Sequence, residues 1–167
     1  MKVGVILTAF ALAGCAAPRT ALTPDGAWDP DNVFAQIQAG REPAAIVYQD
    51  AELLVIMDHA PVSSGHALVL SKTAHARDII DVPPATLARM MAMARRLVVA
   101  ERVGLGADGS SVIINSGSVQ TVHSLHVHVI PTYAGKPIDW SARAAIQSQP
   151  ELEAVAVKLR AALAAQR

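Results

Sequence analysis

The stretch Gln120–Pro131, QTVHSLHVHVIP, decides the fold, because apolar and polar residues alternate along its second half. Alternation with a period of two predicts a half-buried β-strand, which we place over Thr121–Pro131. In such a strand Ser124, His126 and His128 share one face as a polar row. The other face carries His123, Leu125, Val127 and Val129, and it is mostly apolar. We therefore expect one face to meet the core and the other to hold the chemistry.

The segments on either side extend this prediction. Ser111–Ile114 is a short apolar run that predicts a strand, and Asn115–Ser118 is typical of a tight turn between the two strands. After Pro131 the chain becomes loop-like, until Pro150-Glu151 begins a last helix. One side of that helix carries Leu152, Val155, Leu159 and Leu163.

A long helix precedes these strands. Val82-Pro83-Pro84 opens it, with Asp81 as the candidate cap, since prolines are tolerated in a first turn. Its apolar stripe, at helical spacing, consists of Leu87, Met90, Met91, Ala94, Leu97 and Val98. Gly104 and Gly106 are expected to end it.

Three more strands and a short helix complete the domain. The strands are predicted at Ala45–Tyr48, Leu53–Met57 and His66–Leu70, and the helix at Val33–Gln38 with Asp31-Asn32 as its cap. Strands and helices do not alternate as βαβ units. This favours an α+β fold with an antiparallel five-stranded sheet and two main helices.

The N-terminus resembles an export signal. Residues 1–14 have a basic start and a short apolar core, and Leu12-Ala13-Gly14-Cys15 resembles the bacterial lipoprotein box. The resemblance implies cleavage before Cys15 and lipidation of this cysteine, which would anchor the protein to a membrane. Residues 15–30 are expected to be a linker and residues 31–167 the folded domain. Ala16 after the cysteine favours the periplasmic side of the outer membrane in a bacterial cell envelope.

Composition narrows the function classes. The 167 residues suit one domain, and 52% hydrophobic residues suffice for a core. The formal net charge is zero, and no basic stripe is present, so we predict no nucleic-acid partner.

The polar row with His126 and His128 allows three interpretations from spacing alone. Two histidines at i and i+2 on a strand can share a zinc ion. A neutral imidazole can instead attack phosphorus or an acyl centre while its second nitrogen donates to a carbonyl or carboxylate. Paired histidines can also be structural. Spacing gives these three interpretations equal weight.

Neighbouring motifs resemble the histidine triad (HIT) family of nucleotide-binding proteins. The residues that carry the likeness are Asn115-Ser116-Gly117, Gln120-x-Val122 and His126-Val127-His128-Val129-Ile130-Pro131. Order and spacing match over roughly residues 31–140. The resemblance implies an α+β domain that forms a homodimer, and it implies no cofactor and no metal. It also implies a pocket for a purine nucleoside monophosphate, with hydrolysis or transfer at the α-phosphorus through a nucleotidyl-histidine.

The same resemblance assigns roles to individual residues. His126 would be the nucleophile, and His128 would form a hydrogen bond in the phosphate region. Asp58 would bind the ribose hydroxyls. The polar positions around the phosphate would be Asn115, Gln120 and Thr121. His66 and His75 match positions outside the pocket, where packing or hydrogen bonding is expected.

The chain departs from the family pattern at two places. Ser124 stands where the first histidine of the triad belongs, and a serine hydroxyl, unlike an imidazole, cannot take up an additional proton at neutral pH. The loop between Gly117 and Gln120 is also shorter than usual. These departures leave an alternative to the enzyme, a catalytically weakened binding or interaction protein. A zinc site that uses His126 and His128 is a third interpretation.

Overall fold

The computed structural model describes residues 28–140 and 145–166. The predictions on residues 1–14 and on Cys15 lie outside these described residues. The helices are α1 (Val33–Gln38), α2 (Pro84–Leu105) and α3 (Gln149–Ala164). The strands are β1 (Ile46–Gln49), β2 (Leu53–Met57), β3 (Ala67–Ser71), β4 (Gly109–Ile114) and β5 (His126–Thr132).

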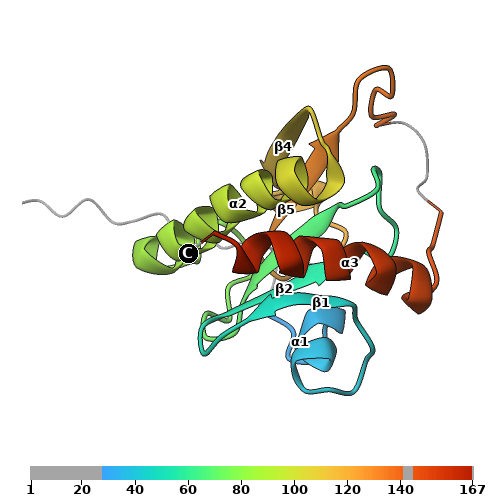
Figure 1. The fold of residues 1–167 in the computed structure, drawn as a ribbon. Coiled ribbons are helices and arrows are strands. Elements are labelled where there is room, and N and C mark those ends of the chain that lie inside the picture. Colours follow the sequence, from blue (N-terminus) through green and yellow to red (C-terminus); the bar gives the residue numbers. More distant parts are fainter. Residues whose placement is uncertain (1–27, 141–144, 167) are drawn as a thin grey trace, which may run out of the picture.

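All five strands form one antiparallel sheet in the order β1-β2-β3-β5-β4 (Figure 1). This confirms the predicted α+β class with an antiparallel five-stranded sheet. The last strand in the chain to join, β5, lies between β3 and β4. The stretch with which the sequence argument began is therefore interior to the sheet.

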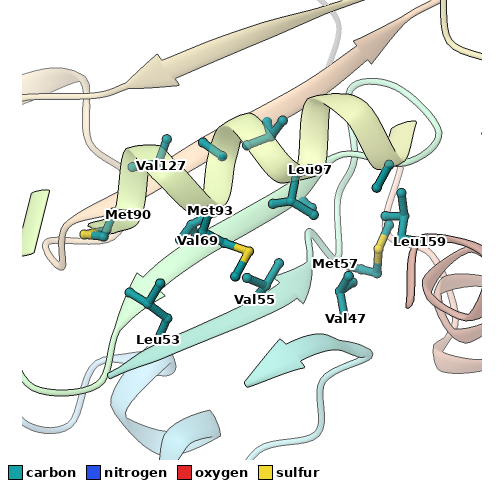
Figure 2. Close-up of a cluster of buried hydrophobic side chains, with 14 of the residues drawn as sticks. Val47, Leu53, Val55, Met57, Val69, Met90, Met93, Leu97, Val127 and Leu159 are labelled. Atoms are coloured by element: carbon teal, nitrogen blue, oxygen red, sulfur yellow. The ribbon is translucent and has the colours of Figure 1, made fainter. Parts of the chain in front are cut away.

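One face of the sheet is covered by α2 and α3. Figure 2 shows Met93 and Leu97 of α2 next to Val55 and Val69 of the neighbouring strands β2 and β3, and Val127 of β5 belongs to the same cluster. Leu159 of α3 packs into the same cluster, and the three valines and Leu97 are 0% exposed. Burial of this apolar surface, at about 25 cal/mol per Å², is the main force that holds the layers together.

The opposite face carries α1 and the histidines of β5. Phe34 of α1 packs there against Leu54, Ile56, Leu68 and Leu70. His126 pairs with Leu70, and His128 pairs with Leu68, across the β3–β5 ladder. Directly opposed residues of an antiparallel pair point to the same face. Both histidines therefore lie on the α1 side, away from α2 and α3.

Helix ends follow local sequence signals at most positions. The Asn32 side-chain oxygen accepts hydrogen bonds from the backbone N–H groups of Phe34 (3.0 Å) and Ala35 (3.1 Å), which confirms the predicted cap of α1. The predicted Asp81 cap of α2 is wrong. Pro83 is the N-cap, with no side-chain cap bond. Asp81 instead accepts from the backbone N–H of Asp78 (3.2 Å).

The C-terminal end of α2 lies at the second predicted glycine. Gly106, at φ +70°, caps the helix in the left-handed region, which a residue without a Cβ adopts at little cost. Gly104 is still helical, so the prediction that it ends the helix is wrong. A Cβ at Gly104 would lie 2.9 Å from the Lys158 carbonyl oxygen, so the glycine allows α2 and α3 to approach closely.

The predicted strand over Thr121–Pro131 is too long at its start. β5 begins at His126, and a 3₁₀ turn, η1 (Gly117–Val119), precedes it. The residues between η1 and β5 form hydrogen bonds with a loop instead of with a neighbouring strand. The Leu125 backbone N–H donates to the Ala76 carbonyl (2.9 Å), and the Gln120 side chain donates to the Arg77 carbonyl (2.8 Å). The parity argument therefore holds for His126 and His128 but does not extend to Ser124.

Candidate active site

His126 is held by the backbone just before its own strand. Its Nδ1 lies 2.7 Å from the Ser124 carbonyl oxygen. A carbonyl only accepts, so Nδ1 carries the proton and the lone pair of the neutral ring lies on Nε2. Burial lowers the pKa of His126 below its usual value, against opposing effects of the Ser124 bond and of Asp58. The ring is therefore neutral at pH 7 and in the tautomer that a nitrogen nucleophile needs.

A second set of hydrogen bonds runs from Asn115 through His128 to His66. The Asn115 side-chain N–H donates to Nε2 of His128 (3.3 Å), and Nδ1 of His128 lies 2.9 Å from Nε2 of His66. Since Nε2 of His128 accepts, Nδ1 carries its proton and donates to His66. His66 then has its proton on Nδ1, which lies 3.4 Å from Oδ2 of Asp58.

Both histidines of this hydrogen-bonded series, His66 and His128, are held neutral. Burial is the main cause that lowers the pKa of His128, to about 3, and nearby His126 and His66 add to it. Burial also lowers the pKa of His66, although the Asp58 carboxylate opposes the change. A second proton on either ring would remove an acceptor and break the order of donors and acceptors from Asn115 to His66. The arrangement therefore fixes the orientation of His128 without placing a positive charge in the site.

A cavity of about 290 Å³ opens beside His126 and His128. Its apolar wall is built from α1 and from neighbouring strands and loops, by Val33, Phe34, Ile37, Ile56, Leu68 and Val122. The Phe34 ring meets the His126 ring edge to face, with centroids 4.9 Å apart. Phe34 thus lies both in the core and in the cavity wall.

A second, more open hollow of about 610 Å³ adjoins the first. The two share Asp58, His59, Thr121 and His128. The second hollow also contains Asn115, His66 and the exposed ring of Trp140. Two compartments thus meet at His128, and each is lined by both apolar and polar residues.

The predicted site residues divide into two groups. His126, His128, Asp58 and Thr121 line the first cavity, and Asn115 lines the second. Ser124 and Gln120 are buried elsewhere. The Ser124 hydroxyl accepts from the indole N–H of Trp28 (3.2 Å), and Gln120 holds the Arg77 carbonyl. Through its backbone carbonyl, however, Ser124 still contacts His126.

Asp78 supports the turn after β4 and was not singled out from the sequence. Its carboxylate accepts from the Ser116 hydroxyl (2.7 Å) and from the Gly117 backbone N–H (2.6 Å), and it is 1% exposed. Burial would raise the pKa of Asp78, but these hydrogen bonds and those from Ile79 and Ile80 outweigh burial and lower it. Nothing in its irregular surrounding sequence predicts this long-range contact.

Asp58, His66 and His128 form a group whose metal-ligating atoms all lie within 4.8 Å of one another. This group differs from the zinc site predicted from residue spacing, which used His126 and His128. Nε2 of His66 and Nδ1 of His128 share a proton at 2.9 Å, so their lone pairs are not both directed at one external point. An ion would have to replace that hydrogen bond. The arrangement is therefore better suited to fix ring orientation than to bind metal.

The sheet, the pair of buried His126 and half-buried His128 on its α1 face and the adjoining cavity define a small α+β protein with a histidine-based pocket. The chain belongs to the HIT family, since the HIT domain model matches residues 39–135. It is 39% identical over 136 residues to an uncharacterised HIT-like protein of Mycobacterium tuberculosis, a match that spans 80% of this chain and 94% of that protein.

Two further similarities are informative. A zinc-bound histidine triad family protein from Mycobacterium smegmatis has a TM-score of 0.72 at 39% identity and covers 81% of this chain and 94% of its own. An adenylylsulfatase of Arabidopsis thaliana is 31% identical over 103 residues, which are 60% of this chain and 52% of that enzyme. The chain thus has the fold of the HIT family, a family that includes nucleotide-binding proteins and hydrolases.

Proposed function

We propose that the chain hydrolyses a bond at the α-phosphorus of a purine nucleoside monophosphate derivative, through a nucleotidyl intermediate on His126. The observation that carries this proposal is the bond from Nδ1 of His126 to the Ser124 carbonyl, which leaves the lone pair on Nε2. Burial keeps the ring neutral, and the ring lines the cavity. A nucleophile with a held tautomer is what attack at phosphorus requires.

The reaction would proceed in two steps. Nε2 forms a bond to phosphorus while the bond to the leaving group breaks, and the leaving group takes the electron pair and then a proton from water. His126 is now positively charged, with its Nδ1 proton held by the Ser124 carbonyl. Water then attacks phosphorus, the phosphorus–nitrogen bond returns its electrons to Nε2, and the water proton passes to solvent. The product is a nucleoside monophosphate.

The two compartments match the two halves of such a substrate. The apolar wall with Phe34 and Ile56 suits a purine ring, and the Asp58 carboxylate beside it suits the ribose hydroxyls. One N–H of the Asn115 amide holds His128, and its second N–H is left for a phosphate oxygen. The second hollow then receives the leaving group. The similarity to an adenylylsulfatase supports an adenylyl substrate.

Substitution of the nucleophile tests this mechanism. The full chain, purified in mild detergent, is assayed with adenosine phosphoramidate and with a dinucleoside polyphosphate. His126→Asn should reduce kcat by at least about a thousand-fold, because it removes the attacking nitrogen. The matched control is His123→Asn, whose side chain is exposed three residues earlier. If His126→Asn turns substrate over as fast as the control, the mechanism is wrong.

A second candidate is a binding protein on the same fold that turns nothing over. The observation that favours it is Ser124, which replaces the first histidine of the triad and directs its hydroxyl to Trp28. The pocket would then hold a nucleotide without cleaving it. Calorimetric titration with adenosine monophosphate, combined with an inert parent in the assay above, would support this candidate. Turnover that depends on His126 would exclude it.

We also propose that two copies pair through β4, as the family likeness implies. β4 is an edge strand, and the exposed side chains of Val99, Val103 and Val112 lie on α2 and β4. An unpaired edge flanked by apolar side chains is suited to strand addition. Light scattering after size exclusion should give a dimer mass. Val112→Lys should shift it to a monomer if this edge is the interface.

Envelope anchoring through Cys15 is a further proposal that rests on residues 1–15 of the sequence. In the described part of the chain, no helix has the length and apolar content to cross a membrane. Labelling of cells with a radioactive fatty acid should mark the parent chain but not Cys15→Ala. An unlabelled parent would contradict the proposed lipid anchor.

A further inference from the structure

Trp28 connects the segment before α1 to the start of the catalytic strand. Its ring stacks on the His75 imidazole, with centroids 4.3 Å apart and planes inclined by 8°. Its indole N–H donates to the Ser124 hydroxyl (3.2 Å). We call Trp28, His75 and Ser124 the tryptophan clasp. Two different contacts, one flat stack and one directed hydrogen bond, fix the position of the indole.

A backbone hydrogen bond also joins the two loops that carry His75 and Ser124. His75 is followed by Ala76, whose carbonyl accepts from the Leu125 N–H (2.9 Å) beside Ser124. Trp28 therefore bridges two loops that are already joined by one backbone hydrogen bond. Ser124 is 8% exposed in this position. Within the described residues, Ser124 precedes β5, so the ladder of the sheet does not hold it.

The two oxygens of Ser124 have different partners. The hydroxyl oxygen accepts from Trp28, and the carbonyl oxygen accepts from Nδ1 of His126 at 2.7 Å. Rotation of the Ser124 backbone would therefore move the carbonyl away from the ring of His126. A contact that holds the Ser124 side chain opposes this rotation.

We propose that Trp28 is a positioning residue for His126 and that it acts through Ser124. This role rests on the proposed function of His126 as the nucleophile. The indole N–H fixes Ser124, the Ser124 carbonyl fixes the Nδ1 proton, and Nε2 keeps its lone pair toward the cavity. This assigns a purpose to the serine at position 124. Its hydroxyl is an acceptor for the indole, and its backbone orients the nucleophile.

Trp28→Phe separates the hydrogen bond from the stack, since phenylalanine keeps a ring for His75 but has no N–H. A net hydrogen bond contributes on the order of 1 kcal/mol, so kcat should fall roughly five-fold while KM stays near the parent value. Ser124→Ala should give a similar loss, because it removes the same bond from the other side. The double variant should lose no more than either single variant.

Nitrogen-15 NMR of the histidine rings gives a readout that does not need turnover. In the parent, His126 should show a single tautomer with the proton on Nδ1. In Trp28→Phe and Ser124→Ala it should show a mixture of both tautomers. The matched control is Asp31→Ala, which changes an exposed acceptor of the Gln36 side chain in the same N-terminal segment. It should leave the His126 signals unchanged.

The outcomes separate this inference from the proposed function. If the parent is inert but Trp28→Phe mixes the tautomers of His126, the clasp is supported and only the hydrolase proposal fails. If the tautomer of His126 is the same in parent and Trp28→Phe, the inference is overturned, whatever the activity. Additive losses in the double variant would also overturn it, because Trp28 would then act by a route that does not include Ser124.

Discussion

His66 links the Asp58 carboxylate to the ring of His128 in the interior of the site. It is 3% exposed, and its Nδ1 has no hydrogen-bond partner within the described residues, although Asp58 lies 3.4 Å away. The position was expected to serve packing or hydrogen bonding outside the pocket. The hydrogen bond to His128 agrees with the hydrogen-bonding role, but His66 lines the second hollow and so does not lie outside the site, and it fixes the tautomer of a site residue.

His66→Phe should destabilise the protein although it keeps the size of the ring. It removes the acceptor for the Nδ1 proton of His128, and a buried donor without a partner costs about 1–3 kcal/mol. Urea unfolding at pH 7.5 measures the loss. His59→Phe is the control, because the His59 side chain is 74% exposed. Equal stability of His66→Phe and the control would contradict the assigned proton order.

At the scale of elements, the turn before β3 depends on Gly65. Its φ is +104°, a conformation that a residue with a Cβ rarely adopts. A Cβ there would lie 2.4 Å from Cδ1 of Leu105 and 2.9 Å from Cγ of Pro131. The absence of a side chain at Gly65 thus allows the end of α2 and the end of β5 to pack against the turn that precedes His66.

Gly65→Ala should therefore cost about 2–4 kcal/mol in unfolding free energy, from backbone strain and overpacking together. Gly40→Ala is the matched control, since Gly40 has φ +70° but its added Cβ would meet nothing within 4 Å among the described residues. It should cost about 1 kcal/mol, from the backbone alone. If Gly65→Ala lowers the unfolding free energy no more than Gly40→Ala does, Leu105 and Pro131 can move aside at little cost and the overpacking argument is wrong.

Element boundaries show where local signals suffice. Asn32 caps α1 and Gly106 ends α2 through contacts within one turn, so the residues themselves predict them. The false extension of β5 over Thr121–Leu125 has the opposite cause. Its alternating pattern is real, but the Ala76 and Arg77 carbonyls, far away in the sequence, take the hydrogen bonds that a strand partner would need.

Over the whole molecule, buried ionisable groups make stability depend on pH in two opposed ways. Burial lowers the pKa values of His66, His126 and His128, so the unfolded chain binds their protons first as pH falls below 6.5. Stability is then lost on acidification. Burial raises the pKa of Glu101 from 4.5 to about 7, although the Ser110 hydroxyl bond opposes it. Stability is therefore lost as pH rises from 4.5 to 7.

Glu101→Gln isolates the second effect. Glutamine resembles the protonated acid and keeps an acceptor for Ser110, so its stability should not follow this titration. The gain in unfolding free energy over the parent should be larger at pH 8 than at pH 5 by about 2.5 kcal/mol. Urea unfolding at both pH values measures this difference. Glu42→Gln, at an exposed carboxylate, serves as the control. A difference for Glu101→Gln that does not change with pH would mean that the carboxyl is ionised throughout.

The sequence by itself determined the α+β class, the capped α1 and the shared face of His126 and His128, because these depend on neighbours within a few residues and on strand period. Only the tertiary structure decided what the ring nitrogens of His128 contact. His66 and Asn115 reach His128 across the sheet, and Trp28 reaches Ser124 across 96 residues of sequence. Local pattern carries no information about such pairs, since packing of the layers sets those distances. The histidine pair is thus predictable from sequence, whereas its tautomers and the tryptophan clasp are products of the fold.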